Sequence, residues 1–393
     1  MRALPLLLLA QPLFAADTRL DAIRELLAPL RTNDLANHKS RGATPAFTTL
    51  KHRLRDWIES RLAELKWNGT EWKPDPSIFQ EQLNQDLGKA GLFCGDEWKI
   101  PCREWSLLGF LGDISLEMKA GSFLVVKTAL GIECGYDESA YVYKSDGGRW
   151  QRLWQSEQDD YRGDKYFPQT FDEVAISPTN YEKDADKSAH LILTLGHNPW
   201  CTSNWQTVYY RVWHTSNAVA APALLLDGRE IGFIEEIRGT VSRHDVLFQY
   251  YVESIERGYT RPQIRHYVLN GARLDRVDPV ATTPRYFVAF WLTGSPDASN
   301  LSDPENRAAL EQWRRAHPGP FMELGFPPRH CKQQPDLWQL STTHGRNEEE
   351  QVYFLVRWRP PYRFTMVSAG SQPRPDCTED DPDADHPLPL FPR

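Results

Sequence analysis

The sequence lacks the motifs that most directly identify a chemistry. It contains no Walker P-loop, no G-x-G-x-x-G after a strand, no H-E-x-x-H, no G-x-S-x-G elbow and no EF-hand loop. A nucleotide-binding protein, a zinc protease and an α/β-hydrolase therefore have no motif support, and the sequence indicates no cofactor. C-x-x-C motifs and Cys/His pairs at structural zinc spacing are also missing, so we expect no metal site.

Long apolar runs are confined to the first residues of the chain. No run of about 18 apolar residues occurs after them, and the mean hydropathy is −0.56, which excludes an integral membrane bundle. The start MRALPLLLLAQPLFAAD has one basic residue, an apolar stretch over 4–14, and small residues at Ala15 and Ala16. We interpret residues 1–16 as a signal peptide, which predicts a secreted or periplasmic protein; the alternative is an apolar first helix packed into the core.

An excess of positive charge is the third absence. The 393 residues include 45 Lys and Arg against 53 Asp and Glu, for a net charge of −8. A chain without a basic stripe lacks the attraction that holds most nucleic-acid binders and that draws proteins to anionic membranes. We therefore expect no nucleic acid partner, and an extracellular or envelope protein or a polysaccharide instead.

The six cysteines form an even set, which in an oxidising compartment predicts disulfides although fifteen pairings are open. Proximity favours Cys94–Cys102, and Cys331–Cys377 would staple the C-terminal region. The remaining pair is Cys134–Cys201. The alternative is that some of the six are free buried thiols.

Residues 17–104 are predicted to form a small helical N-terminal region. Apolar residues recur at spacings of three and four over 20–30 and again over 47–65, as in amphipathic helices. A third helix is expected to begin at Asp75-Pro76, with the acid as cap and proline at the first helical position, and to end near Gly88. Three short helices predict a cap on a larger structure.

Residues 105–370 have the β-branched and aromatic runs of antiparallel β structure. The strongest expected strands are 121–130, 190–196, 245–251 and 286–293, and each is followed by an aromatic strand, at 139–144, 206–213, 263–270 and 351–358. An insertion over 302–317 is expected to be a helix, with Asp303 as its cap. Residues 371–393 form an acidic, proline-rich tail that we expect to be extended or disordered beyond Cys377.

The strand pairs recur regularly enough to suggest a repeat. Asp146-Gly147 and Asn270-Gly271 fall at equivalent places, where two-residue hairpin turns are expected. The fold class is therefore predicted to be mainly β, with about four propeller-like units or, alternatively, a β-sandwich or other stacked antiparallel sheets. In this alignment Cys134 and Cys201 are equivalent, which favours their pairing.

Candidate ligand-binding residues cluster in two loops. Trp200 and Trp205 flank Cys201 in the polar stretch HNPWCTSNW, which also offers His197 for hydrogen bonding. Indole faces stack on sugar rings, and fourteen tryptophans are present. Asp137 lies in the equivalent loop after Cys134, so we expect it near the same rim. The alternatives are that the strand tryptophans belong to the core and that the loop acids are solvated and share no site.

A non-catalytic binding or interaction module is the function that the sequence favours. The alternative is a secreted carbohydrate-active hydrolase with paired loop carboxylates, because glycosidases need two carboxyl groups about 5–9.5 Å apart. Asp137 and Glu138 in one loop and Asp172 and Glu173 in the next are the acids that would form such a pair. No catalytic residue is identified by the sequence.

Overall fold

The structure is a computed structural model of the chain. It describes residues 17–32, 46–68, 70–102, 107–119, 122–132, 135–146, 148–158, 168–177, 189–199, 205–215, 221–253, 260–319, 321–322, 327–345, 350–385 and 390. Residues 1–16, which carry the predicted signal peptide, lie outside these ranges. Within them, none of the helices combines the length and the apolar character needed to cross a membrane.

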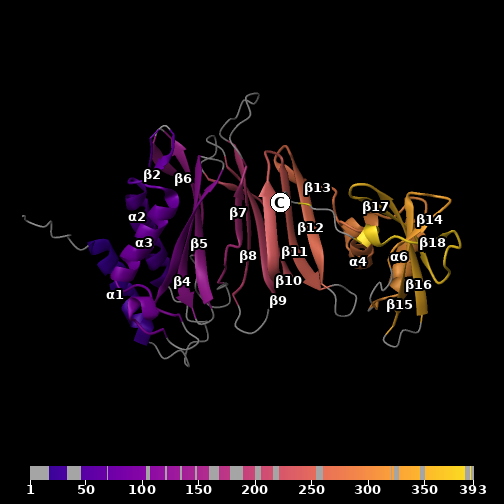
Figure 1. Ribbon diagram of the computed structural model, residues 1–393, viewed down its shortest axis with the longest axis horizontal. Helices are drawn as coiled ribbons and strands as arrows, with labels where there is room; N and C mark the ends of the chain where they lie inside the picture. Colours follow the sequence, from indigo (N-terminus) through magenta and orange to yellow (C-terminus); the bar gives the residue numbers. More distant parts are fainter. Residues whose placement is uncertain are drawn as a thin grey trace, which may run out of the picture.

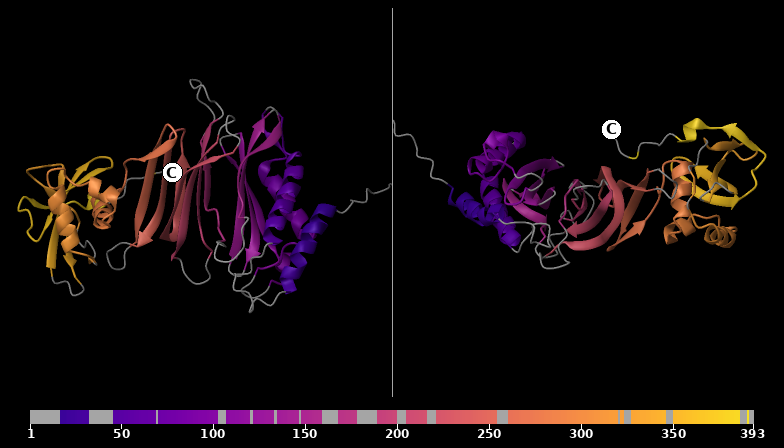
Figure 2. Two further views of the ribbon diagram at one scale, coloured as in Figure 1. Left: turned by 180° about the vertical axis from the view of Figure 1, so that it is seen from behind. Right: turned by 90° about the horizontal axis from the view of Figure 1, so that it is seen from below.

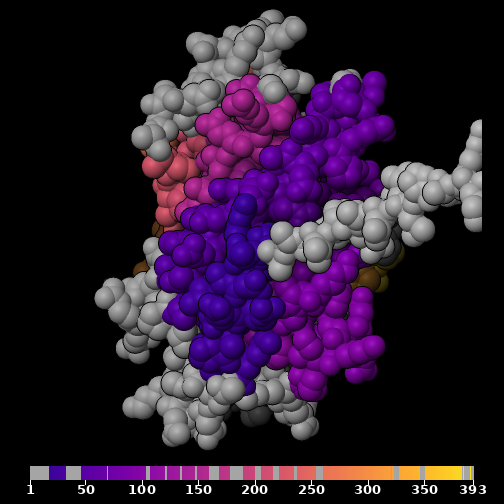
Figure 3. Space-filling view, turned by 90° about the vertical axis from the view of Figure 1, so that its left-hand side faces the viewer, coloured from indigo at the N-terminus to yellow at the C-terminus, as the bar shows by residue number. Residues whose placement is uncertain are grey.

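Three helices form the first layer, as the apolar periodicity predicts (Figures 1 and 3). They are α1 (Thr18–Thr32), α2 (Ala46–Leu62) and α3 (Pro76–Lys89). Asp75 caps α3 by accepting a hydrogen bond from the Ser77 backbone N–H, so the predicted start is confirmed. Between α2 and α3 a two-stranded hairpin forms from β1 (Lys66–Trp67) and β2 (Trp72–Lys73).

The helices cover one face of a four-stranded antiparallel sheet, with which they share a core. Its strands, in sequence order across the sheet, are β3 (Leu111–Lys119), β4 (Phe123–Ile132), β5 (Gly135–Asp146) and β6 (Arg149–Ser156). Side chains of α3 also satisfy the edge strand β3: Asn84 bonds both the N–H and the C=O of Ile114, at 2.8 and 3.0 Å. The edge is thereby closed to further strand pairing.

A seven-stranded sheet packs on the other face of this sheet. Its strands, again in sequence order, are β7 (Glu173–Ile176), β8 (His190–His197), β9 (Trp205–Thr215), β10 (Ala223–Val241), β11 (Asp245–Glu253), β12 (Thr260–Asn270) and β13 (Arg273–Arg276). The long β10 pairs with β9 and β11 and also lies against β7 and β8, so the sheet curls over its own core (Figure 2). Gly239 is where it meets β8: a Cβ there would lie 2.5 Å from a Leu193 methyl carbon, so a side chain would fit only if that leucine shifted.

The C-terminal part combines three helices with a five-stranded sheet. The helices are α4 (Pro284–Leu292), α5 (Pro296–Asn300) and α6 (Arg307–Ala316), and the sheet order is β17 (Arg363–Gly370), β16 (Glu350–Arg359), β15 (Leu337–His344), β14 (Arg329–Cys331) and β18 (Cys377–Asp380). It lies at the opposite end of the molecule from the N-terminal helices (Figure 1). Short 3-10 turns at Asp96–Trp98 and Pro382–Asp385 complete the described elements.

The fold is mainly β with stacked antiparallel sheets, as one of the two predicted arrangements requires. Each of the first three expected strand pairs forms an antiparallel pair, β4 with β5, β8 with β9 and β11 with β12. The first pair belongs to the four-stranded sheet, whereas the other two share the seven-stranded sheet. The hairpins after β5 and β12 also form, one residue later than expected, because Asp146 pairs with Arg149 and Asn270 with Arg273.

The expected strand over 286–293 is wrong, because this segment forms helix α4. Thr283 caps it by accepting a hydrogen bond from the Tyr286 backbone N–H, and Pro284 occupies its first turn. The run is buried on nearly every side, so its sequence shows neither the alternation of a strand nor the stripe of a surface helix. The helix expected over 302–317 exists but starts later, at Arg307.

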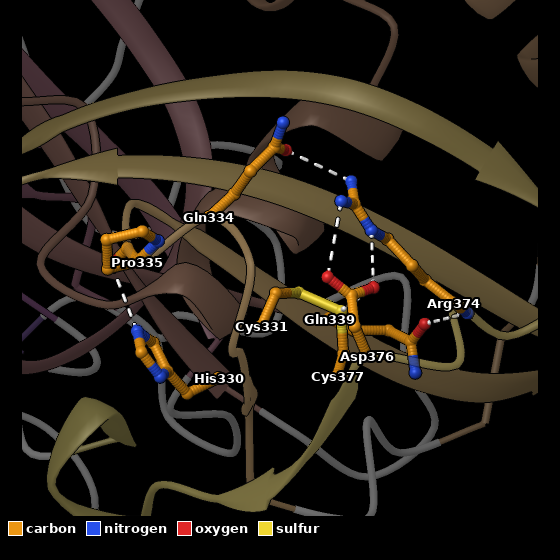
Figure 4. The surroundings of a disulfide bond; sticks show 8 residues. All are labelled: His330, Cys331, Gln334, Pro335, Gln339, Arg374, Asp376 and Cys377. Carbon is orange, nitrogen blue, oxygen red and sulfur yellow. Dashed lines mark hydrogen bonds and ion pairs between the residues drawn. A yellow bond between two sulfur atoms is a disulfide. The ribbon is translucent and has the colours of Figure 1, made fainter.

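Two of the three expected disulfides are confirmed, Cys94–Cys102 and Cys331–Cys377. The second joins β14 to β18 and is flanked by an Arg374–Asp376 ion pair at 2.6 Å (Figure 4). It holds the start of the acidic tail in the five-stranded sheet, where residues 377–380 are extended as strand β18. Disulfides are typical of chains that mature in an oxidising compartment.

Cys134 and Cys201 lie outside the described residues, so their pairing stays a prediction. Their neighbours Gly135 and Pro199 are close: a Cβ added to Gly135 would lie 3.3 Å from the Cβ of Pro199.

Candidate functional site

Asp137, one of the predicted ligand-binding residues, lies inside the molecule. Its carboxylate is 2.9 Å from the Lys51 ammonium of α2, and the two side chains are 0% and 1% exposed. A charge at such depth is costly unless an opposite charge accompanies it, and the pair joins the helical layer to β5. A ligand on the surface therefore does not touch Asp137.

The next residue, Glu138, faces the other way because side chains alternate along a strand. Its Oε2 accepts the Phe171 backbone N–H at 2.6 Å, between the four-stranded and seven-stranded sheets. Burial raises the pKa of the Glu138 carboxyl, whereas the Phe171 hydrogen bond and the charge of Lys127 lower it; the charges of Asp172 and His197 make smaller contributions of opposite sign. The expected neighbours Asp137 and Glu138 thus belong to different interfaces.

His197, the third predicted residue, pairs with Asp172. Its Nδ1 is 2.7 Å from the Asp172 Oδ2 and 2.9 Å from the Thr170 hydroxyl. The backbone also ties the two segments, since Thr170 N–H donates to the His197 carbonyl at 2.9 Å. We call Glu138, Asp172 and His197 the acid–histidine cluster; a protonatable acid beside a carboxylate–imidazole pair is an arrangement that can move protons.

The predicted tryptophan pair is described only in part. Trp205 begins β9 and packs edge-on against Phe233 of β10, with ring centroids 5.4 Å apart. Trp200 lies outside the described residues. Of the four predicted residues, the structure therefore places His197 in a polar cluster, Asp137 in the interior and Trp205 against the sheet.

Sequence reasoning missed three other tryptophans that come together at the surface. Trp72 of β2 stacks on Trp150 of β6, with ring centroids 4.6 Å apart, and Trp67 of β1 packs at a tilt on Trp72 at 5.4 Å. The Trp150 indole N–H donates to the Leu65 carbonyl at 3.1 Å, which fixes its ring, while Trp67 is 47% exposed. We call Trp67, Trp72 and Trp150 the tryptophan stack.

The β1–β2 hairpin places this stack. Asn68 turns the chain between the strands, with its side-chain oxygen accepting the N–H groups of Thr70 and Glu71 at 3.0 and 2.9 Å. Strand pairing then sets Trp67 directly opposite Trp72. The stretch WNGTEW over 67–72 carries a signal that could have been used: two large apolar rings flanking a polar turn.

Two hollows flank the stack. The first, which we call the tryptophan groove, has a volume of about 790 Å³ and is lined by Trp67, Trp72, Ile78 and Met118, with polar groups from Glu71, Asp75, Gln80 and Glu117. The second, which we call the basic pocket, has a volume of about 700 Å³ and is lined by Trp150 together with Glu59, Tyr143, Lys66, Arg149 and Arg152. Figure 1 shows β2 and β6 side by side at one end of the helical layer.

Glu59 organises the floor of the basic pocket. Its Oε1 is 2.5 Å from an Arg152 guanidinium nitrogen and accepts the Tyr143 hydroxyl at 3.2 Å. Burial and the charge of Glu59 raise the pKa of Tyr143, so its hydroxyl stays protonated and donates. Among the described residues, no group of three His, Cys, Asp or Glu side chains is arranged to hold a metal ion.

No protein-family model and no curated protein sequence matches this chain. Among solved structures, one described as a glycoside hydrolase aligns over 68% of this chain and 74% of its own, at 9% identity and a TM-score of 0.25. A likeness at that level informs neither the fold nor the function.

Proposed function

We propose that this protein is an extracytoplasmic, non-catalytic carbohydrate-binding protein whose ligand lies on the tryptophan stack. The observation that carries the proposal is an exposed Trp67 fixed beside Trp72 at the rim of the tryptophan groove. Sugar rings present C–H faces that stack on indoles. The exposed polar side chains around the groove supply the few hydrogen bonds that orient such a ligand.

The exposed apolar surface at this end of the molecule involves more than one isolated side chain. Trp67 is 47% exposed, and Ile78, across the same groove, is 52% exposed. Adjacent exposed apolar groups rimmed by charges are typical of an interaction site rather than of ordinary surface.

The test is a titration of the protein with a panel of soluble polysaccharides, read by isothermal calorimetry or affinity electrophoresis. Trp67→Ala should weaken binding by about 10-fold, since an anchoring aromatic contributes about 1–3 kcal/mol. The matched control is Ile231→Ala on β10, which is 65% exposed and does not line the groove. Binding that survives W67A and fails with I231A would refute the site, and capture of a protein but of no glycan would refute the ligand class.

A second candidate function, hydrolysis of carbohydrate, is favoured by the acid–histidine cluster. Burial raises the pKa of Glu138, which is the direction that a general acid requires, and Asp172 lies 2.7 Å from the His197 ring. In this hypothesis Glu138→Gln abolishes release of reducing ends from a polysaccharide that the protein binds, without weakening binding. No release by the parent protein would exclude this candidate and leave the binding function standing.

A further inference from the structure

The basic pocket carries an excess of positive charge, whereas the chain as a whole is acidic. Its charged lining comprises three cations, Lys66, Arg149 and Arg152, against the single anion Glu59. The whole chain has a net charge of −8. A local excess of cations on an acidic protein indicates a specific use of positive charge at this place.

Two of these cations have no ionic partner among the described residues. Arg152 is engaged by Glu59 at 2.5 Å, whereas Lys66 and Arg149 form no ion pair with any residue that the structure describes. Both are exposed. An incoming anion therefore displaces no partner from either side chain within the described part of the chain.

The cations of the basic pocket lie beside one ring of the tryptophan stack, because Trp150 lines the same pocket. Lys66 directly precedes Trp67 on β1, and Arg149 directly precedes Trp150 on β6, so each leaves its strand on the face opposite to the neighbouring ring. Arg152 shares a face of β6 with Trp150, since side chains two apart on a strand point the same way. A ligand that extends from the tryptophan groove past Trp150 into the basic pocket thus leaves a lining with the acids Glu71, Asp75 and Glu117 and reaches one with an excess of cations.

We infer that the basic pocket binds an anionic substituent, a carboxylate or a sulfate ester, of the saccharide that stacks on the tryptophans. This inference rests on the proposed carbohydrate-binding function and makes the ligand an acidic polysaccharide. Guanidinium groups form paired hydrogen bonds with both kinds of oxyanion. Because screening limits the field of the acidic chain to about 8 Å at physiological salt, local groups decide the attraction.

The test compares matched ligands. Oligogalacturonate is titrated beside the same oligosaccharide with its carboxylates reduced to alcohols, and dextran sulfate beside dextran. We expect at least one anionic ligand to bind about 10-fold tighter than its neutral partner, the size of a charged hydrogen bond. The arm that shows the difference identifies the anion as carboxylate or sulfate, and the difference should shrink as salt is raised.

The variant pair Lys66→Gln and Arg149→Gln together should abolish this preference, so that the anionic ligand binds no tighter than its neutral partner. Its control is Arg53→Gln with Lys89→Gln, which removes the same charge from exposed positions of α2 and α3 outside the pocket. An equal loss in the control would overturn the inference, because any cation would then serve.

The two proposals fail separately. Equal binding of both members of each pair, still sensitive to W67A, would overturn the anionic ligand and keep carbohydrate binding. No binding of any of the four ligands at millimolar concentration would count against both proposals.

Discussion

The acid–histidine cluster and the tryptophan stack differ in what their groups already contact. In the cluster, Glu138 accepts a backbone N–H and Asp172 accepts from His197. In the stack, Trp67 presents nearly half its surface to solvent, and nearby Lys66 has no described ion partner. A ligand at the cluster must replace protein hydrogen bonds, whereas one at the stack replaces only water.

This difference explains why we assign binding to the stack. Only the surplus over lost contacts and lost freedom appears as affinity, so a surface with unused groups binds more readily than one whose groups are satisfied. Interior contacts, in contrast, should act on stability and leave binding unchanged. Four predictions separate the two kinds of region, in order of decreasing effect.

Removing one partner of the buried Lys51–Asp137 pair should have the largest effect. Asp137→Ala leaves an uncompensated ammonium in the interior and should lower the free energy of unfolding by about 3–5 kcal/mol. Urea unfolding at pH 7 measures the loss. The double variant Lys51→Met with Asp137→Leu should recover much of it, and a single variant as stable as the parent would show that the pair contributes little.

A buried and an exposed tryptophan should respond in opposite ways. Trp291 of α4 is 0% exposed and donates its indole N–H to Ser302 at 2.8 Å, so Trp291→Ala should cost about 3–5 kcal/mol of stability without weakening saccharide binding. Trp67→Ala should change stability by no more than about 0.5 kcal/mol and weaken binding. Thermal unfolding and calorimetric titration of both variants check this, and weaker binding by folded W291A would contradict the assignment.

The Cys331–Cys377 disulfide should contribute to stability alone. It closes a sequence separation of 46 residues at the end of the molecule opposite the tryptophan stack. Replacing both cysteines by serine should cost about 2–4 kcal/mol, measured by urea unfolding, with unchanged saccharide affinity. Loss of affinity in the folded variant would mean that the two ends are coupled.

Local patterns predict most of the elements, with α4 as an exception, whereas long-range contacts determine the site. The spacing of Leu20 to Leu30 and the Asp75-Pro76 cap identify helices because the signals lie within a few residues. The sequence does not predict the tryptophan stack, because Trp150 is 78 residues from Trp72 and no local signal joins them. The sequence predicts one loop for Asp137 and Glu138, whereas both lie on strand β5, whose alternation directs one to the helices and the other to the seven-stranded sheet.

The smallest effect concerns the charge of Glu138. Its pKa is raised in the folded protein, so the folded state binds this proton more tightly than the unfolded state does, and stability falls as pH rises through the interval between the two pKa values. The loss of stability is absent below the pKa of the unfolded state, about 4.3, and complete above the pKa of the folded state. Glu138→Gln has no such proton, so its stability relative to the parent should rise over that interval and then stay constant. Urea midpoints of both proteins from pH 4 to 8 measure this difference in stability. Glu117→Gln, at an exposed acid of β3, is the control. A parallel pH dependence of E138Q and the parent would show that the buried carboxyl is ionised at no cost.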